Sequence, residues 1–84
     1  MIKELGNVIK NARQESGYSQ SEFADKLSVN PSFLSKLENG KIKYPNSVIL
    51  YRISCNLDLE YEDLLKYLGF DILSLDKENI RVFT

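Results

Sequence analysis

The chain has 84 residues, of which 43% are hydrophobic and 27% charged, and its formal net charge is −1. This length provides one domain with a modest core, and the composition is that of an ordinary soluble globular protein. The sequence has no apolar run long enough to cross a bilayer, no signal-peptide pattern and only one cysteine, so we expect a cytoplasmic protein with no internal disulfide and no membrane partner.

The first expected element is a helix that ends near Glu15. Gly17 follows it and can adopt the left-handed conformation that closes a helix, because it has no Cβ to clash at positive φ. The helix itself is predicted by apolar residues at helical spacing, namely Ile2, Leu5, Val8, Ile9 and Ala12.

Two short helices joined by a tight turn come next. Ser19-Gln20-Ser21-Glu22 is a capping box, in which the serine and the glutamate each satisfy a backbone N–H of the helix start. After the turn at Ser28-Val29, Asn30 can cap a third helix and Pro31 suits its first position. That helix is expected to stop at Asn39-Gly40. The inward residues expected for the pair are Phe23, Ala24, Leu27, Phe33, Leu34 and Leu37.

Two further helices are expected. Asn46 can cap a fourth one, which follows a loop over residues 41–45, and the fifth is expected to begin near Glu60 and to end at Gly69. Their apolar faces would comprise Ile49, Leu50, Ile53 and Leu57, and then Tyr61, Leu64, Leu65 and Leu68. Residues 79–83 alternate as a short strand would.

Charge is divided unevenly along the chain. Eight basic and five acidic residues up to Leu57 give that part a net charge of +3, whereas three basic and seven acidic residues from Asp58 onward give −4. One end could therefore attract phosphate while the other repels it. A mixed, solvated surface would also account for the pattern.

Two short helices with a tight turn, the second opening on small polar residues, form the arrangement that places a helix in the major groove. Residues 5–65 resemble the helix-turn-helix domain of lambdoid phage repressors and Cro proteins, the Cro/CI or xenobiotic-response-element family. The matching residues are Arg13, Gly17, Ser19-Gln20, Phe23-Ala24, Lys26-Leu27, Leu34, Leu37-Glu38-Asn39-Gly40-Lys41, Lys43 and Pro45.

The resemblance implies an all-α, compact five-helix lambda-repressor-like domain over residues 1–69. It also implies roles for individual residues. Lys36 is the first candidate for a base contact, because lysine can donate to the acceptors of guanine, although a phosphate contact or a solvated lysine is the alternative. Phe33 could contact a thymine methyl or could pack between helices. The full set expected to face the bases is Asn30, Pro31, Ser32, Phe33 and Lys36.

Phosphate contacts are expected at the start of the second helix and in the loop after the third. Gln20 and the N–H groups beside it could hold a phosphate, and the resemblance implies that this glutamine also braces the third helix. In the loop, backbone N–H groups and two ammonium groups would face phosphate. The candidates are Ser19, Gln20, Asn39, Lys41, Lys43, Tyr44 and Asn46.

Arg13 and Glu38 match a structural ion pair of the family, which sets the angle of the third helix. The chain also departs from the family pattern. Pro31 stands where relatives often carry a base-reading Arg or Gln, which favours apolar contact and DNA shape over hydrogen bonds. Ser28 and Asp58 replace expected glycines, and Glu60 takes a capping place that Ser or Thr usually holds.

Other classes of function are less well supported. The chain has no histidine, and its one thiol, Cys55, lies in an expected helix without a basic partner, so we expect no enzyme, metal site, cofactor or small-molecule ligand. The acidic cluster from Asp58 to Asp63 is better explained as a helix start that complements the helix dipole. The main alternative is a protein-interaction module, such as an antitoxin or a repressor-partner protein, that binds through the acidic C-terminal part.

The expected function is a transcriptional regulator, most simply a repressor, that binds double-stranded DNA as a homodimer on a palindromic operator. One short domain offers few contacts, and residues 70–84 supply an unassigned apolar segment that could serve in dimerisation. This extension could prolong the fifth helix, pair as a strand across a two-fold axis, or pack on the core of its own domain.

Overall fold

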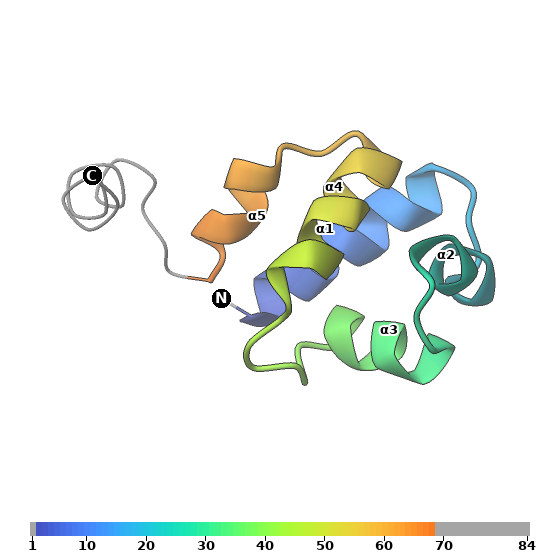
Figure 1. Ribbon diagram of the computed structural model, residues 1–84, viewed down its shortest axis with the longest axis horizontal. Helices are drawn as coiled ribbons and strands as arrows, with labels where there is room; N and C mark the ends of the chain where they lie inside the picture. Colours follow the sequence, from blue (N-terminus) through green and yellow to red (C-terminus); the bar gives the residue numbers. More distant parts are fainter. Residues whose placement is uncertain (1, 69–84) are drawn as a thin grey trace, which may run out of the picture.

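The computed structural model describes residues 2–68, with side chains from residue 3 onward, and this part of the chain forms five helices and no strand (Figure 1). The helices are α1 (Ile2–Glu15), α2 (Gln20–Leu27), α3 (Pro31–Glu38), α4 (Ser47–Leu57) and α5 (Tyr61–Lys66). The expected all-α, five-helix fold is thereby confirmed. The fifth helix ends at Lys66, earlier than the expected end at Gly69, and the expectations for residues 70–84 lie outside the described residues.

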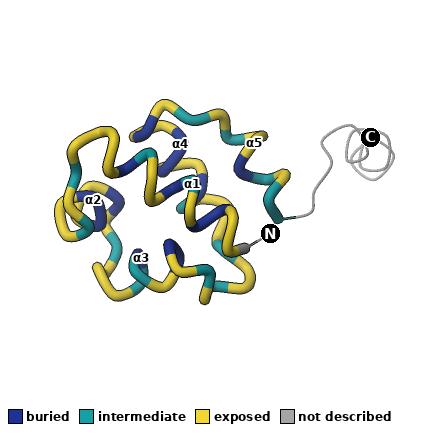
Figure 2. The backbone as a smooth tube through the Cα atoms, turned by 180° about the vertical axis from the view of Figure 1, so that it is seen from behind, coloured by how far each residue is buried: buried dark blue, intermediate teal, exposed yellow. Residues whose placement is uncertain are grey.

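A single hydrophobic core lies between the helices. Figure 2 shows buried positions on the inward side of each helix. Burial of one large apolar side chain contributes about 1.5–3 kcal/mol. This burial, rather than intrinsic propensity, stabilises α2 and α3, because isolated helices of eight residues are not stable in water. The core residues are Leu5, Ile9, Phe23, Ala24, Leu27, Leu34, Leu37, Leu50, Ile53, Leu57 and Leu64.

The starts of three helices carry the caps expected from the sequence. At α2, the Ser19 hydroxyl accepts from the Glu22 N–H at 3.1 Å, and the Glu22 carboxylate accepts from the Ser19 N–H at 2.9 Å. The side-chain oxygens of Asn30 and Asn46 accept from the N–H of the second residue of α3, Ser32, and of α4, Val48, at 2.8 and 2.7 Å. Glu60 precedes α5 without a side-chain cap. Local signals therefore define where α2, α3 and α4 begin.

The turns contain two side chains in the left-handed region. Ser28 has φ 58° after α2, and Asp58 has φ 56° after α4. These are the positions at which the sequence departs from expected glycines. The turns therefore keep the left-handed backbone conformation of glycine, although it is strained for serine and aspartate. The Ser28 turn leaves only residues 28–30 between α2 and α3, which fixes the angle between these two helices.

α1 lies very close to the C-terminal end of α3. A Cβ added to Gly6 would come within 2.6 Å of the Leu37 carbonyl oxygen, which is closer than real contacts allow. Gly6 therefore permits a backbone approach that no other residue would allow. Across the domain, Arg52 of α4 donates to the carbonyl of Leu27 at 3.3 Å and places a positive charge at the C-terminus of α2. No helix of residues 2–68 has the length and apolar character needed to cross a membrane.

Candidate nucleic-acid interface

α3 has one face in the core and one in solvent. Leu34, Leu37 and Glu38 are buried, whereas Pro31, Ser32 and Lys36 are exposed. The outward residues of α3 and Gln20 of α2 line an open groove of about 420 Å³. Three of the five residues expected to contact bases therefore lie together on the outward face of α3.

Asn30 and Phe33 have additional structural roles. Asn30 is exposed, but its side-chain oxygen caps α3, so only its amide nitrogen is left to donate to a ligand. Phe33 is half-buried and packs against the hydrophobic core. The position of this ring favours packing between helices over contact with a thymine methyl.

A buried hydrogen-bond network connects α3 to the two helices before it. Arg13 of α1 donates to both carboxylate oxygens of Glu38, from Nε at 2.7 Å and from Nη2 at 3.1 Å. Gln20 Nε2 of α2 donates to the same carboxylate at 3.1 Å, and Arg13 Nη1 donates to the Tyr18 carbonyl at 2.8 Å. The two charged side chains are only 8% and 1% exposed.

This network holds the C-terminal end of α3, through Glu38, against α1 and the start of α2. Among the described residues, no buried side-chain nitrogen or oxygen lacks a partner, so the two desolvated charges are fully compensated. The ion pair expected between Arg13 and Glu38 is present, and Gln20 takes the bracing position that the resemblance implies. Because the bidentate geometry fixes both planes, α1, α2 and α3 keep one relative orientation.

The use of Gln20 as a brace changes how the start of α2 could bind phosphate. Its side-chain nitrogen already donates to Glu38, and the Ser19 hydroxyl accepts from the helix. The first N–H groups of a helix have no partner within it, so those of Gln20 and Ser21 are the backbone donors that α2 itself does not use. A hydrogen bond from the Ser19 backbone holds the pKa of the Glu22 carboxyl below its ordinary value of 4.5. Glu22 therefore keeps its negative charge beside this helix start.

The loop after α3 is held by its own backbone. The N–H of Gly40 donates to the Leu37 carbonyl at 3.2 Å, and the N–H of Lys41 donates to the Lys36 carbonyl at 2.8 Å. With Gly40 at φ 74°, this is a Schellman motif. The N–H of Asn39 and its side-chain amide both donate to the carbonyl of Ser35. The expectation that the N–H groups of this loop face phosphate is therefore wrong for residues 39–41, because those groups close the helix.

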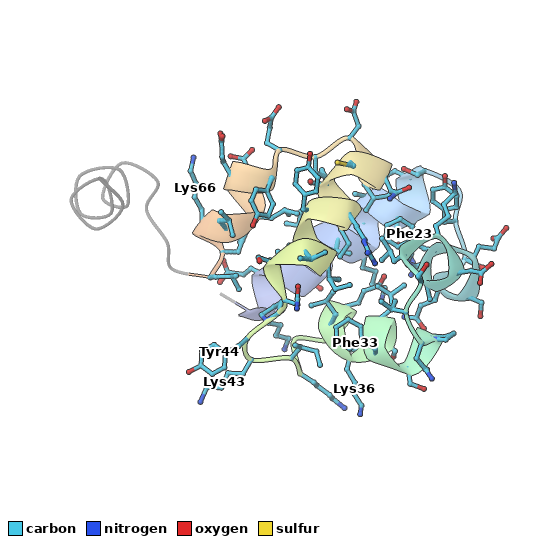
Figure 3. The ribbon with its side chains drawn as sticks, viewed as in Figure 1. Phe23, Phe33, Lys36, Lys43, Tyr44 and Lys66 are labelled. Atoms are coloured by element: carbon cyan, nitrogen blue, oxygen red, sulfur yellow. The ribbon has the colours of Figure 1, made fainter. Side chains whose placement is uncertain are left out.

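The side chains of the loop, in contrast, are directed outward. Lys41 and Lys43 are exposed, and Tyr44 is 84% exposed with the Lys43 ammonium 5.9 Å from its ring centre. In Figure 3, Lys36, Lys43 and Tyr44 project from the same side of the molecule, and Lys66 projects from the other. Lys36 of α3, together with Lys43 and Tyr44 of the loop, therefore forms one basic edge, and the exposed Lys41 belongs to the same loop. The side-chain oxygen of Asn46, which follows this loop in the sequence, is occupied as the cap of α4.

Sequence reasoning missed two residues beside this edge. Ser35 lines the groove together with Pro31, Ser32 and Lys36, and its position one turn after Pro31 could have indicated this. Lys3 lies next to the loop, since a Cβ added to Gly40 would be 2.8 Å from the Lys3 Cα. Lys3 is far from the loop in the sequence, so no local signal marks it.

Comparison with known proteins places this geometry in a family. Residues 6–69 match a family model described as a helix-turn-helix domain. The HTH-type transcriptional regulator SinR of Bacillus subtilis (strain 168) is 39% identical over 61 residues, which cover 73% of this chain and 55% of SinR. The ImmF control region 10 kDa protein of Bacillus phage phi105 is 41% identical over 59 residues, which cover 68% of this chain and 64% of that protein.

A solved structure shows the same arrangement of helices. The structure of a SinR protein/SinI protein complex superposes with a TM-score of 0.68 at 34% identity, covering 99% of this chain and 90% of that chain. The regulator SlrR of Bacillus subtilis (strain 168) is 33% identical over 60 residues, which cover 71% of this chain and 40% of SlrR. The chain thus spans about half the length of SinR and less than half that of SlrR.

Proposed function

This chain belongs to the helix-turn-helix domain family, which is not a family of enzymes, and we propose that it binds double-stranded DNA as a sequence-specific transcriptional regulator. In this proposal residues 1–69 are the DNA-binding domain and α3 enters the major groove. One observation carries it. The outward face of α3 and the cations of the following loop lie on one edge, and the buried Arg13–Glu38–Gln20 network holds α3 in place.

The contacts divide into those that read bases and those that hold the backbone. On the outward face of α3, Ser32 and Lys36 can donate to base edges, and Pro31 can make only apolar contact. Lys41, Lys43 and Tyr44 follow α3 at the basic edge and contact phosphates, together with the first N–H groups of α2. Phosphate contacts supply most of the affinity, and the paucity of base-reading donors leaves part of the specificity to DNA shape.

The chain acts as a homodimeric repressor on a two-fold symmetric operator in this proposal. A single α3 covers only a few base pairs, so two copies one helical turn apart are needed for a useful specificity. Residues 70–84 carry apolar side chains that suit a contact between protomers. Sedimentation of the chain with a selected operator duplex should give two chains per duplex, and one chain per duplex would contradict the dimer.

The proposal is tested by selecting duplexes from a random library and measuring their affinity by fluorescence anisotropy at several salt concentrations. Replacing Lys41 and Lys43 with alanine should weaken binding to all sequences and lower the salt slope by about 2, since each phosphate contact contributes about 0.9. Lys66→Ala is the matched control, because Lys66 lies on the other side of the molecule. If the library yields no retained sequence, or if the Lys41/Lys43 variant binds like the control, DNA binding by this edge is refuted.

A second candidate is suggested by the solved relative, which is a complex between SinR and SinI. In this alternative the chain is a protein-interaction module, and the acidic C-terminal part binds another regulator. Charge reversal of Glu62 and Asp63, both exposed on α5, distinguishes the two functions. It should leave DNA affinity nearly unchanged if the basic edge is the functional surface. The alternative would be favoured if the charge-reversed variant lost a copurifying protein partner and if neither it nor the wild-type chain bound DNA.

A further inference from the structure

An apolar pocket of about 360 Å³ lies between α5 and the loop that leads into α4. Its apolar side is formed by Leu50 of α4, Leu65 of α5 and Leu68, two residues after the end of α5. The other side is formed by Lys43, Tyr44, Pro45 and Ser47. A cavity of about 150 Å³ is large enough to bind benzene. This pocket therefore has room for an aromatic ring together with a second apolar side chain.

We propose that Phe70 of the same chain occupies this pocket. Leu68 lines the pocket and is the last described residue, so the chain continues from its rim. Phe70 is two residues further on, a distance of at most about 7 Å in an extended chain. It is also the first large apolar side chain after the rim, and Asp71 beside it can stay in water.

The occupant is the chain's own segment rather than a second copy. A short tether gives Phe70 an effective concentration in the millimolar range at the pocket, whereas a second copy must bind from dilute solution. The assignment also divides residues 70–84 into two parts. Phe70 anchors the segment to its own domain, and the later apolar residues, Ile80, Val82 and Phe83, are left for the contact between protomers.

Occupation of the pocket has a consequence for DNA binding, which rests on the proposed function. Lys43 and Tyr44 belong to the pocket wall and to the basic edge at once. A ring seated between α5 and this loop holds the loop in one position before DNA arrives. Phe70→Ala should then lower DNA affinity by roughly 3- to 10-fold, because the loop must be ordered during binding.

The test is NMR spectroscopy of the full chain with labelled leucine methyl groups. We expect nuclear Overhauser effects between the Phe70 ring and the methyls of Leu50 and Leu65, and these effects should be absent from an isotope-filtered experiment on mixed labelled and unlabelled chains. Phe70→Ala should shift these methyl signals and lower the melting temperature by roughly 5–15 °C. Phe83→Ala, the same change at the far end of the segment, should leave these methyl signals in place.

The outcomes separate this inference from the proposed function. Absence of contacts between Phe70 and the pocket methyls, or contacts seen only between different chains, would overturn the assignment. Contacts within one chain, combined with unchanged DNA affinity of Phe70→Ala, would overturn the link to the loop. If no DNA is bound by any variant, the proposed function fails, and the methyl contacts still decide whether Phe70 occupies the pocket.

Discussion

Removing one partner of the buried Arg13–Glu38 pair should strongly destabilise the domain. In Arg13→Met, the apolar stem of the side chain is kept, but the Glu38 carboxylate loses both guanidinium hydrogen bonds and keeps only the one from Gln20 at 3.1 Å. The Glu38 side chain is 1% exposed, so water does not replace the lost donors. The variant therefore leaves a buried charge nearly uncompensated.

The expected loss is about 3–5 kcal/mol of unfolding free energy, the usual cost of breaking a buried pair. A folded chain of 84 residues has a total stability of roughly 4–13 kcal/mol, so the variant should lose a large share of it. The double variant Arg13→Met/Glu38→Met removes both charges and replaces them with apolar groups. It should recover most of the loss.

Urea unfolding of Arg13→Met, Glu38→Met and the double variant gives a thermodynamic cycle, which isolates the interaction free energy of the Arg13–Glu38 pair. The exposed pair Lys66–Asp63, at 3.5 Å with both side chains 62% exposed, provides the control. Lys66→Met should change stability by no more than about 0.5 kcal/mol, because exposed pairs contribute little. If Arg13→Met cost no more than Lys66→Met, or if the double variant were as unstable as the single one, the reasoning from desolvated charge would be refuted.

Three further predictions concern stability. Gly6→Ala should cost about 1–3 kcal/mol in urea unfolding, because its Cβ would meet the Leu37 carbonyl, and an unchanged midpoint would contradict the close approach of α1 to α3. Ser28→Gly should stabilise the domain by roughly 0.5–1 kcal/mol by removing strain at φ 58°, whereas a loss would mean that the serine makes an unrecognised contact. The stabilisation by the Glu22 carboxylate should be present above pH 4.5 and be lost as the pH falls through the lowered pKa of Glu22. If the unfolding free energy of Glu22→Ala fell in parallel with that of the wild type below pH 4.5, this contribution would be excluded.

The sequence predicted the helix starts well because their signals are local. Ser19 with Glu22, Asn30 with Pro31, and Asn46 each act on a backbone group within three residues, and the structure contains each of these hydrogen bonds. The outward face of α3 followed from the helical spacing of its buried residues. The turn at Ser28 was located correctly because an expected glycine position retains its left-handed geometry when another residue occupies it.

The features that the sequence did not predict depend on contacts between residues that are distant in the chain. The Gly6 approach to α3 and the contact of Gly40 with Lys3 become visible only when the helices are packed. The family resemblance implied that the N–H groups of the loop after α3 face phosphate, but those of Asn39, Gly40 and Lys41 donate to carbonyl groups of α3 instead. The family resemblance implied that Gln20 braces α3, but its partner Glu38, 18 residues away in the chain, is identified only by the structure.

The Arg13–Glu38–Gln20 network links stability to function in this account. A double variant that folds without the charges should still bind DNA less tightly, because Gln20 loses its acceptor and α3 loses its fixed orientation. Equal affinity of the double variant and the wild type would mean that core packing alone orients α3. Folding and DNA binding can therefore be separated in a single protein.

The most direct test of the central claim is the response of DNA affinity to changes in the major groove alone. Selected duplexes should be prepared with 7-deazaguanine or 7-deazaadenine in place of single purines, which removes an acceptor from that groove. The account predicts that at least one such change lowers affinity about tenfold for the wild-type chain, and less for Lys36→Ala if Lys36 donates to that position. Affinity that is insensitive to every major-groove change, but lost when a minor-groove ligand is added, would contradict the placement of α3 in the major groove.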